Sequence, residues 1–191
     1  MKGQKLIPLL VIVAGLLAYH NSFTGPFIFD DTFSIKENPT IRHLWPIWQS
    51  LSPPHRGGLA VEGRPVINLS VAINYALGGY AVWGYHAFNL MVHILAGLTL
   101  FGLVRRTLVQ PRLRERFGSV ANELALATAV LWVVHPLQTE SVTYIIQRAE
   151  SIMGLFYLLT LYCFVRGVES RRRGLWSGLS VTACALGMAS K

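Results

Sequence analysis

Long apolar runs constrain this chain more than any other feature of its sequence. They cover residues 6–23, 85–104, 124–136, 151–165 and 175–189. A helix that crosses a bilayer needs roughly 20 mainly apolar residues, because about 30 Å of hydrocarbon is crossed at about 1.5 Å per residue. Several runs approach or meet that length, and the shorter ones need tilt or polar flanks. We therefore expect an all-α polytopic membrane protein with about five transmembrane helices.

The composition supports a membrane protein and argues against a nucleic-acid-binding one. Only 14% of the 191 residues are charged, whereas an average soluble domain is about a quarter charged. The formal net charge is +8, but the arginines form short clusters between apolar runs, which is typical of membrane topology. The cysteines, Cys163 and Cys184, lie inside apolar runs and have no disulfide or metal-ligand spacing. We expect membrane lipids as partners, no nucleic acid and no metal.

The distribution of Lys and Arg predicts the orientation. With five spans, the N-terminus, residues 105–118 and residues 166–173 lie on one side and hold eleven Lys and Arg, against six on the other side. A further span over 65–80 would move both Arg-rich loops outside, against the positive-inside rule. We therefore expect a retained signal anchor, a cytoplasmic N-terminus, and an interfacial or re-entrant helix over 65–80.

Residues 24–83 are expected to form one long outer loop on the lumenal or periplasmic side of a single membrane domain, 1–191. The part from 24 to 64 is rich in proline and glycine, which favours a loop with short helical pieces. Within it, the stretch 41–51 carries Trp45 and Trp48 among apolar residues at helical spacing. Because Trp favours the membrane–water interface, we expect a short interfacial helix there.

Two adjacent carboxylates, Asp30 and Asp31, follow directly after the first span. They repel each other and are partly desolvated at a membrane boundary, so one of them is expected to have a raised pKa. Such a group suits general base catalysis near neutral pH. The alternative is a solvated turn or an N-cap for a helix over 32–37, where acidic residues are favoured.

Further ionisable residues lie at or near membrane depth, where they tend to be functional or paired. His135 ends one span, and Glu140, Arg148 and Glu150 follow it. Here the alternative to a functional site is an internal ion pair of Arg148 with Glu140 or Glu150. Arg64 precedes the interfacial helix and is expected either to hold a phosphate bidentately or only to reach toward lipid head groups.

His86 and His93 share one helical face, seven residues apart. That spacing corresponds to about 10 Å along the helix, too far for the two side chains alone to share a metal ion. Interhelical hydrogen bonding is the alternative to metal binding for these residues.

Three stretches in this order together resemble one protein family, although each motif alone is weak. The resemblance is to the membrane half of the transmembrane and tetratricopeptide-repeat-containing O-mannosyltransferases and their bacterial relatives, in the C-type glycosyltransferase superfamily. The stretches are Phe27–Ile35 with Asn38-Pro39, then Arg64-Pro65 to Asn74-Tyr75 with Tyr85-His86 and His93, and then His135–Val142 with Arg148-Ala149-Glu150.

The resemblance implies a polyprenyl- or dolichyl-phosphate sugar donor, expected to carry mannose, and a Ser or Thr acceptor in a protein. It implies an active site on the lumenal or periplasmic side and no cofactor besides the donor. By analogy, Asp30 would deprotonate the acceptor hydroxyl, with Asp31 supporting it. The expected substrate-binding residues are Arg64, His86, His135, Glu140, Arg148 and Lys191, of which the three cations would stabilise the phosphate leaving group.

Members of this family have further spans and then tetratricopeptide repeats, which this sequence does not contain. We therefore expect a truncated product or fragment. Two other functions stay open: a non-catalytic membrane scaffold that holds a partner with its outer loop, and a transporter. The transporter would have a water-filled path lined by His86, His93, His135 and Glu140.

Overall fold

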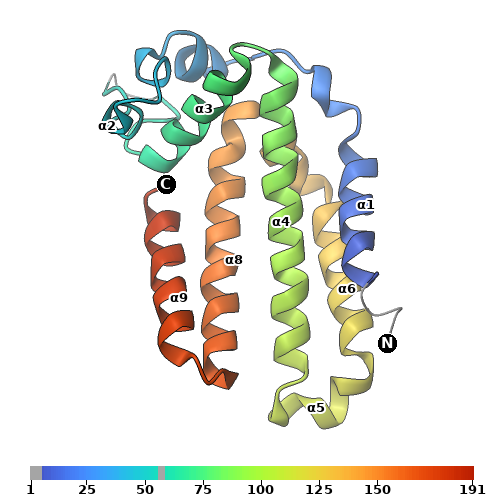
Figure 1. Cartoon of the computed structure of the whole chain (residues 1–191). Coiled ribbons are helices and arrows are strands. Elements are labelled where there is room, and N and C mark those ends of the chain that lie inside the picture. The colour runs from blue at the N-terminus through green and yellow to red at the C-terminus, as the bar shows by residue number, and fades with distance from the viewer. Residues whose placement is uncertain (1–5, 56–58) are drawn as a thin grey trace.

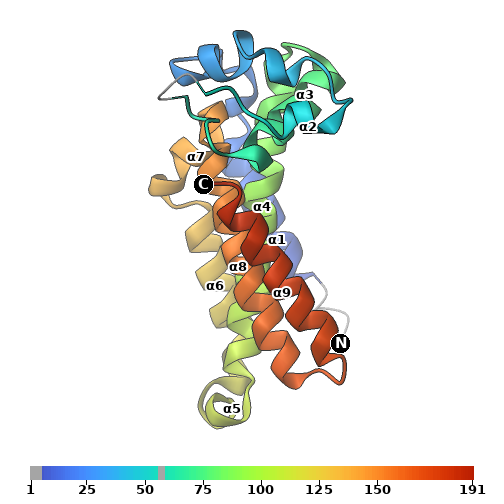
Figure 2. The same ribbon diagram turned by 90° about the vertical axis from the view of Figure 1, so that its left-hand side faces the viewer.

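The computed structural model describes residues 6–55 and 59–191, and it is all-helical, with no strand in these ranges. This confirms the expected all-α class. The long helices run side by side and form a bundle (Figures 1 and 2). They are α1 (Ile7–Tyr19), α4 (Val82–Leu108), α6 (Ala121–Val133), α8 (Arg148–Glu169) and α9 (Arg173–Met188).

Two helices of the described residues are long and apolar enough to cross a membrane. They are α4, with 27 residues, and the segment Ile145–Glu169, with 25 residues. A third span arises if Pro111–Val133 and Pro136–Thr143, which are bent by 53° at their break, count as one. By length and composition the bundle therefore holds two to three candidate spans. The 13-residue α1 falls short because it is only about 20 Å long.

Small side chains let the helices around α4 pack closely. Ala125 and Ala129 of α6 are fully buried against α1 and α4, in a core that includes Val11. A methyl group at Gly97 of α4 would overlap Val133 of α6. Such small residues at helix contacts are typical of membrane bundles. On the other side of α4 lies α8, and α9 packs against α8.

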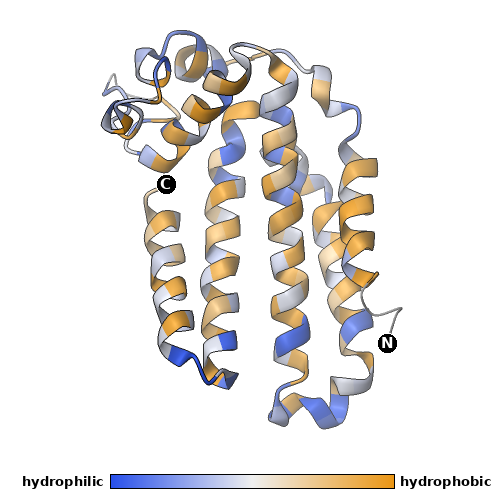
Figure 3. Cartoon of the chain, viewed as in Figure 1, coloured by the Kyte–Doolittle hydropathy of each residue, from blue (hydrophilic) through white to orange (hydrophobic). Residues whose placement is uncertain are grey.

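Both Arg-rich connections lie at the same end of the bundle. One contains α5 (Pro111–Phe117) and the other is the turn between α8 and α9, and both appear as blue patches in Figure 3. The lysines at positions 2 and 5 and the arginine at position 56, which entered the charge argument above, lie outside the described residues. We call this end the arginine end. Its arginines are Arg105, Arg106, Arg112, Arg114, Arg116, Arg166, Arg171, Arg172 and Arg173.

The loop 24–83 covers the opposite end, which we call the loop end. It contains η3 (Thr32–Lys36), η4 (Pro39–Ile41), α2 (Ile47–Ser50) and α3 (Pro65–Gly78), with α7 (Thr139–Thr143) nearby (Figures 1 and 2). Despite its prolines, this loop has a defined inner structure. The fully buried Asn68 of α3 donates from its amide to the Thr40 hydroxyl and to the Ser50 carbonyl, both at 2.8 Å, and accepts from the Asn38 amide at 2.8 Å.

Candidate functional site

The two adjacent aspartates of the loop end have opposite environments. Asp31 is fully buried, whereas Asp30 is exposed. Phe29, just before them, has φ of 42°, in the left-handed region that side chains other than glycine rarely adopt. Strained backbone of this kind often occurs at functional sites. The two carboxyl groups are therefore not equivalent, a question that the sequence alone left open.

Asp31 joins the outer loop to the segment that begins α8. Its Oδ2 accepts the backbone N–H of Ile28 at 3.0 Å, and its Oδ1 accepts the N–H of Ile146 at 2.9 Å. Burial raises the pKa of Asp31 above its ordinary value, and the two N–H donors oppose this shift. Asp31 occupies the N-cap position of η3, but its carboxylate makes no capping hydrogen bond to that helix.

Asp30 lines an open, mainly polar pocket of about 410 Å³. Its backbone N–H donates to the hydroxyl of Tyr144 at 3.1 Å. Arg64, Gln147 and Glu150 also line the pocket, together with the side chains or backbone of Leu59, Ala60 and Ile146. The Arg64 Nη1 donates to the Ala60 carbonyl at 3.0 Å. A carboxylate that can accept a proton thus shares one pocket with a guanidinium that can bind an anion.

One further pocket borders this one, and a second pocket borders that neighbour through Leu137 and Glu140. A pocket of about 230 Å³ shares Gln147 and Glu150 with it and includes Glu140. A more apolar pocket of about 540 Å³ includes Phe29 and Leu137, whose side chains are about four-fifths exposed, together with Tyr144. The Asp30 carboxylate therefore lies between polar and apolar surfaces at the end of the bundle, a setting that suits a substrate with a polar head and a lipid tail.

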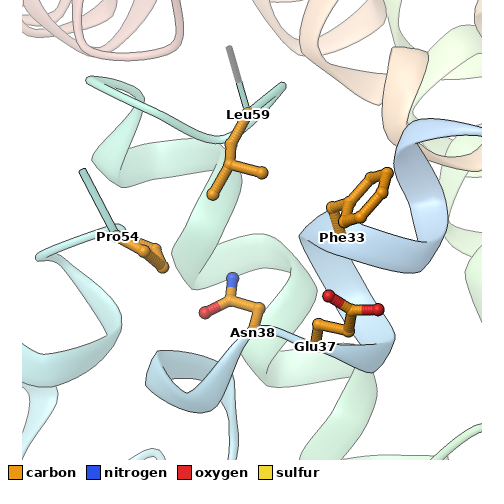
Figure 4. Close-up of a pocket in the computed structure, with 5 residues that line it drawn as sticks. All are labelled: Phe33, Glu37, Asn38, Pro54 and Leu59. Atoms are coloured by element: carbon orange, nitrogen blue, oxygen red, sulfur yellow. The ribbon is translucent and has the colours of Figure 1, made fainter. Parts of the chain in front are cut away.

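A small pocket under the outer loop also adjoins the site. Leu59 lines both this pocket and the Asp30 pocket, and the others that line it are Phe33, Glu37, Asn38 and Pro54 (Figure 4). Its volume is about 30 Å³, which suits a water molecule rather than a sugar.

Arg148 is fully buried and does not face the pocket. Its Nη1 donates to the Asn74 side chain at 2.6 Å, and it also donates to the carbonyls of Ser70, Tyr85 and Ile145. The alternative of an internal ion pair with Glu140 or Glu150 is wrong, because carbonyls and one side-chain amide oxygen accept the hydrogen bonds of the guanidinium. Within the described ranges, the salt bridges are His55–Glu62 and Arg106–Glu169. Arg148 therefore holds α3, α4 and α8 together behind the site.

The other expected site residues are distributed around the same end. His86 is buried, with Nε2 3.0 Å from the Gly25 carbonyl. His135 is exposed, and its Nδ1 accepts the N–H of Leu137 at 3.2 Å. Lys191 is exposed. It lies two residues after Ala189, whose carbonyl accepts the N–H of Val66 at 3.3 Å, so the end of α9 meets the start of α3.

The structure thus brings Asp30 and Arg64 into one pocket and Glu140 into its neighbour, while His86 and Arg148 are buried away from them. Tyr144 is the site residue that sequence reasoning missed. It lies between two motifs and carries no signal of its own, because its contact with Asp30 joins residues 114 positions apart. In the part of the chain that the structure describes, no three His, Cys, Asp or Glu side chains gather as a metal site.

Comparisons with known proteins identify relatives of this chain. The chain is 32% identical over 177 residues to protein O-mannosyl-transferase tmtc2 of Xenopus laevis, a match that covers 88% of the chain and 20% of the relative. It is 32% identical over 167 residues to protein O-mannosyl-transferase TMTC1 of Mus musculus, covering 84% and 17%. Protein O-mannosyl-transferase F38B6.6 of Caenorhabditis elegans is 30% identical over 175 residues, covering 88% and 24%.

The chain thus spans about a fifth of the length of these relatives. No protein-family model and no solved structure matches it. The relatives confirm the resemblance to this family, and their alignments cover 84–88% of the chain. By its sequence, the chain is related, over most of its length, to one part of the transmembrane and tetratricopeptide-repeat-containing protein O-mannosyl-transferases.

Proposed function

We propose that this chain carries the catalytic loop of a transferase that moves mannose from a polyprenyl- or dolichyl-phosphate donor to Ser or Thr of a protein. One observation carries the proposal. Asp30 is an exposed carboxylate in an open pocket that it shares with Arg64, and backbone hydrogen bonds at Asp31 and Tyr144 fix its position. The names of the relatives supply the reaction class.

In the proposed reaction, the Asp30 carboxylate takes the proton of the acceptor hydroxyl. The hydroxyl oxygen then forms a bond to the anomeric carbon from the face opposite the phosphate. The bond from that carbon to the phosphate oxygen breaks, and its electron pair leaves with the lipid phosphate, so the anomeric configuration inverts. Arg64 stabilises the phosphate charge, and Lys191 is the second cation available near the start of α3.

The proposed orientation places the arginine end in the cytoplasm and the loop end in the lumen or periplasm, with five helices of the bundle as spans. It is supported by the positive-inside rule and by the position of both Arg-rich connections at one end (Figure 3). In sealed membranes with the lumenal or periplasmic side outward, single cysteines at Gln110 and Ser170 should resist a membrane-impermeant reagent, while one at Ser52 should react. Labelling of the first two from outside would overturn this orientation.

The function is tested by transfer of labelled mannose from polyprenyl-phosphate mannose to membrane proteins. The membranes carry the chain alone or joined to the remainder of the frog relative, so that segments outside the matched region are also present. Transfer should occur and should vanish in Asp30→Asn, which keeps the shape of the side chain but not its basicity. The matched control is Glu115→Gln, an exposed acid at the arginine end, which should leave transfer unchanged.

Absence of transfer by the folded wild-type chain in both forms would contradict the proposal. Capture of a partner protein that survives Asp30→Asn would then favour the scaffold.

A further inference from the structure

A strongly apolar surface projects from the outer loop beside α3. Between residues 44 and 51, every large apolar side chain is more than a third exposed. Trp45 and Trp48 are the most exposed, at 79% and 63%, and their rings lie 6.4 Å apart. Leu44, Ile47 and Leu51 complete this surface, which we call the tryptophan face.

The tryptophan face is held in place from the inside by polar contacts. The hydroxyl of the buried Ser50 donates to the carbonyls of His43, at 3.0 Å, and Thr40, at 3.4 Å. The Ser50 carbonyl in turn accepts from the buried amide of Asn68 on α3. The segment is therefore a fixed structure that presents its apolar side outward, and it is not a loose loop whose exposure results from poor packing.

The position of this face relative to the bundle suggests what covers it. It lies at the loop end, beside α3 and outside the column of α8 and α9 (Figures 1 and 2). Trp83, the second residue of the candidate span α4, is 64% exposed, and Tyr80 just before it is 47% exposed. Exposed Trp and Tyr at the ends of spanning helices are typical of the membrane–water interface. An apolar face of this size is unfavourable in water.

We propose that the tryptophan face inserts into the lipid head-group layer of the leaflet on the Asp30 side, with Trp45 and Trp48 as the anchor. The aromatic rings then lie near the acyl boundary, and the outer loop is fixed at the depth of the lipid phosphates. One consequence rests on the proposed function: the anchor holds the Asp30 pocket at the level where a lipid-borne sugar phosphate would enter. Its effect is therefore on binding of the donor and not on the chemical step.

The test is quenching of tryptophan fluorescence in nanodiscs made with brominated phosphatidylcholine. Bromine at carbons 6 and 7 of the acyl chain probes shallow depth, and bromine at carbons 11 and 12 probes the bilayer centre. Wild-type emission should contain a component that shallow bromine quenches at least twofold more than deep bromine. The double substitution Trp45→Phe/Trp48→Phe, which keeps apolar rings in place, should reduce that component to the share contributed by the exposed Trp83.

A second variant tests the two tryptophans of the face without the other tryptophans of the chain. Replacing Trp83, Trp132 and Trp176 by Phe leaves the two tryptophans of the face, which should retain the shallow quenching and resist aqueous iodide. Strong quenching by iodide without quenching by bromine, in either the difference measurement or this variant, would overturn the proposal. It would show that the face meets water, whereas weak quenching by both agents would show that protein covers the face and would overturn the proposal as well.

The consequence for the donor is tested separately. Trp45→Ala/Trp48→Ala should raise the KM for polyprenyl-phosphate mannose several-fold and leave kcat near the wild-type value. An unchanged KM in a variant that still transfers mannose would contradict the proposed effect of the anchor on donor binding. Failure of the wild type to transfer mannose would instead contradict the proposed function, while the quenching result would still decide the anchor.

Discussion

The two ends of the bundle are built by different means. At the loop end, Asp31, Asn68 and Arg148 are fully buried and hydrogen-bond to groups between 3 and 115 positions away in the sequence. At the arginine end, most arginines are exposed, and Arg106 makes a salt bridge, to Glu169, at 3.6 Å. Exposed charges determine only the sign of the charge on a surface. Buried polar groups determine the relative positions of the elements they join, because each group needs its hydrogen-bond partners in place.

Among substitutions at the two ends, those of arginine are expected to differ most in their effect on the free energy of unfolding. Arg148→Met leaves the Asn74 side chain and several carbonyls without their donor in a buried site. It should lower the free energy of unfolding by about 3 kcal/mol or more. Arg112→Met on the exposed face of α5 should change it by at most about 0.5 kcal/mol. Thermal unfolding in detergent measures both, and equal effects would show that burial does not separate the two ends.

Asparagine substitutions should give a smaller difference of the same kind. Asn68→Ala removes three side-chain hydrogen bonds that join α3 to the outer loop, so a loss of about 2 kcal/mol is expected. The control is Asn122→Ala near the arginine end, which removes one exposed hydrogen bond to Arg105 and should cost less than about 1 kcal/mol. A greater loss for Asn122→Ala in the same unfolding experiment would reverse the comparison.

Tyr144→Phe tests whether the loop end positions Asp30. It removes only the hydroxyl that accepts the Asp30 backbone N–H, a hydrogen bond of about 1 kcal/mol, so kcat for mannose transfer should fall about fivefold. KM should stay near wild type, and the melting temperature should fall by about 4 °C at most. Tyr157→Phe, an exposed tyrosine on α8, is the matched control and should have no effect. A rise in KM alone would assign Tyr144 to substrate binding.

The smallest expected effect is the pH dependence of stability that comes from Asp31. Because burial raises the folded pKa of Asp31 above its unfolded value, ionisation disfavours the folded state. The stability that Asp31 contributes, relative to Asn at the same position, is fully present below the ordinary pKa of about 3.9. This stability is lost as the pH rises through the raised pKa of the folded state. The difference in melting temperature between wild type and Asp31→Asn should therefore decrease from pH 4 to pH 7. An increase would mean that the Ile28 and Ile146 donors outweigh burial.

Much of the helical framework could be predicted from the sequence. The expected runs at 85–104 and 151–165 lie within α4 and α8, because apolar length alone identifies helices of this kind. The number of spans could not be fixed in the same way. The apolar helices α1 and α3 end after 13 and 14 residues, and run length does not determine whether such helices cross a bilayer or lie at its surface.

The environments of the charged residues could not be predicted from the sequence, for a physical reason. The alternative to a functional role for Arg148 was an ion pair with a nearby carboxylate, but apart from the Ile145 carbonyl its partners come from α3 and α4, more than 60 positions away. Likewise, nothing in the Asp30-Asp31 pair indicates which carboxylate is buried. That depends on the backbone at Phe29 and on the Ile146 amide, which only the folded chain brings together.

The central claim is that the exposed Asp30 acts as the base and the buried Asp31 only positions it. Chemical rescue tests this division directly: mannose transfer is measured for Asp30→Ala and Asp31→Ala with increasing formate. In the open pocket, formate should replace the missing carboxylate and restore transfer to Asp30→Ala, and it should not restore transfer to Asp31→Ala. Rescue of Asp31→Ala alone, or no rescue of a folded Asp30→Ala, would contradict the account.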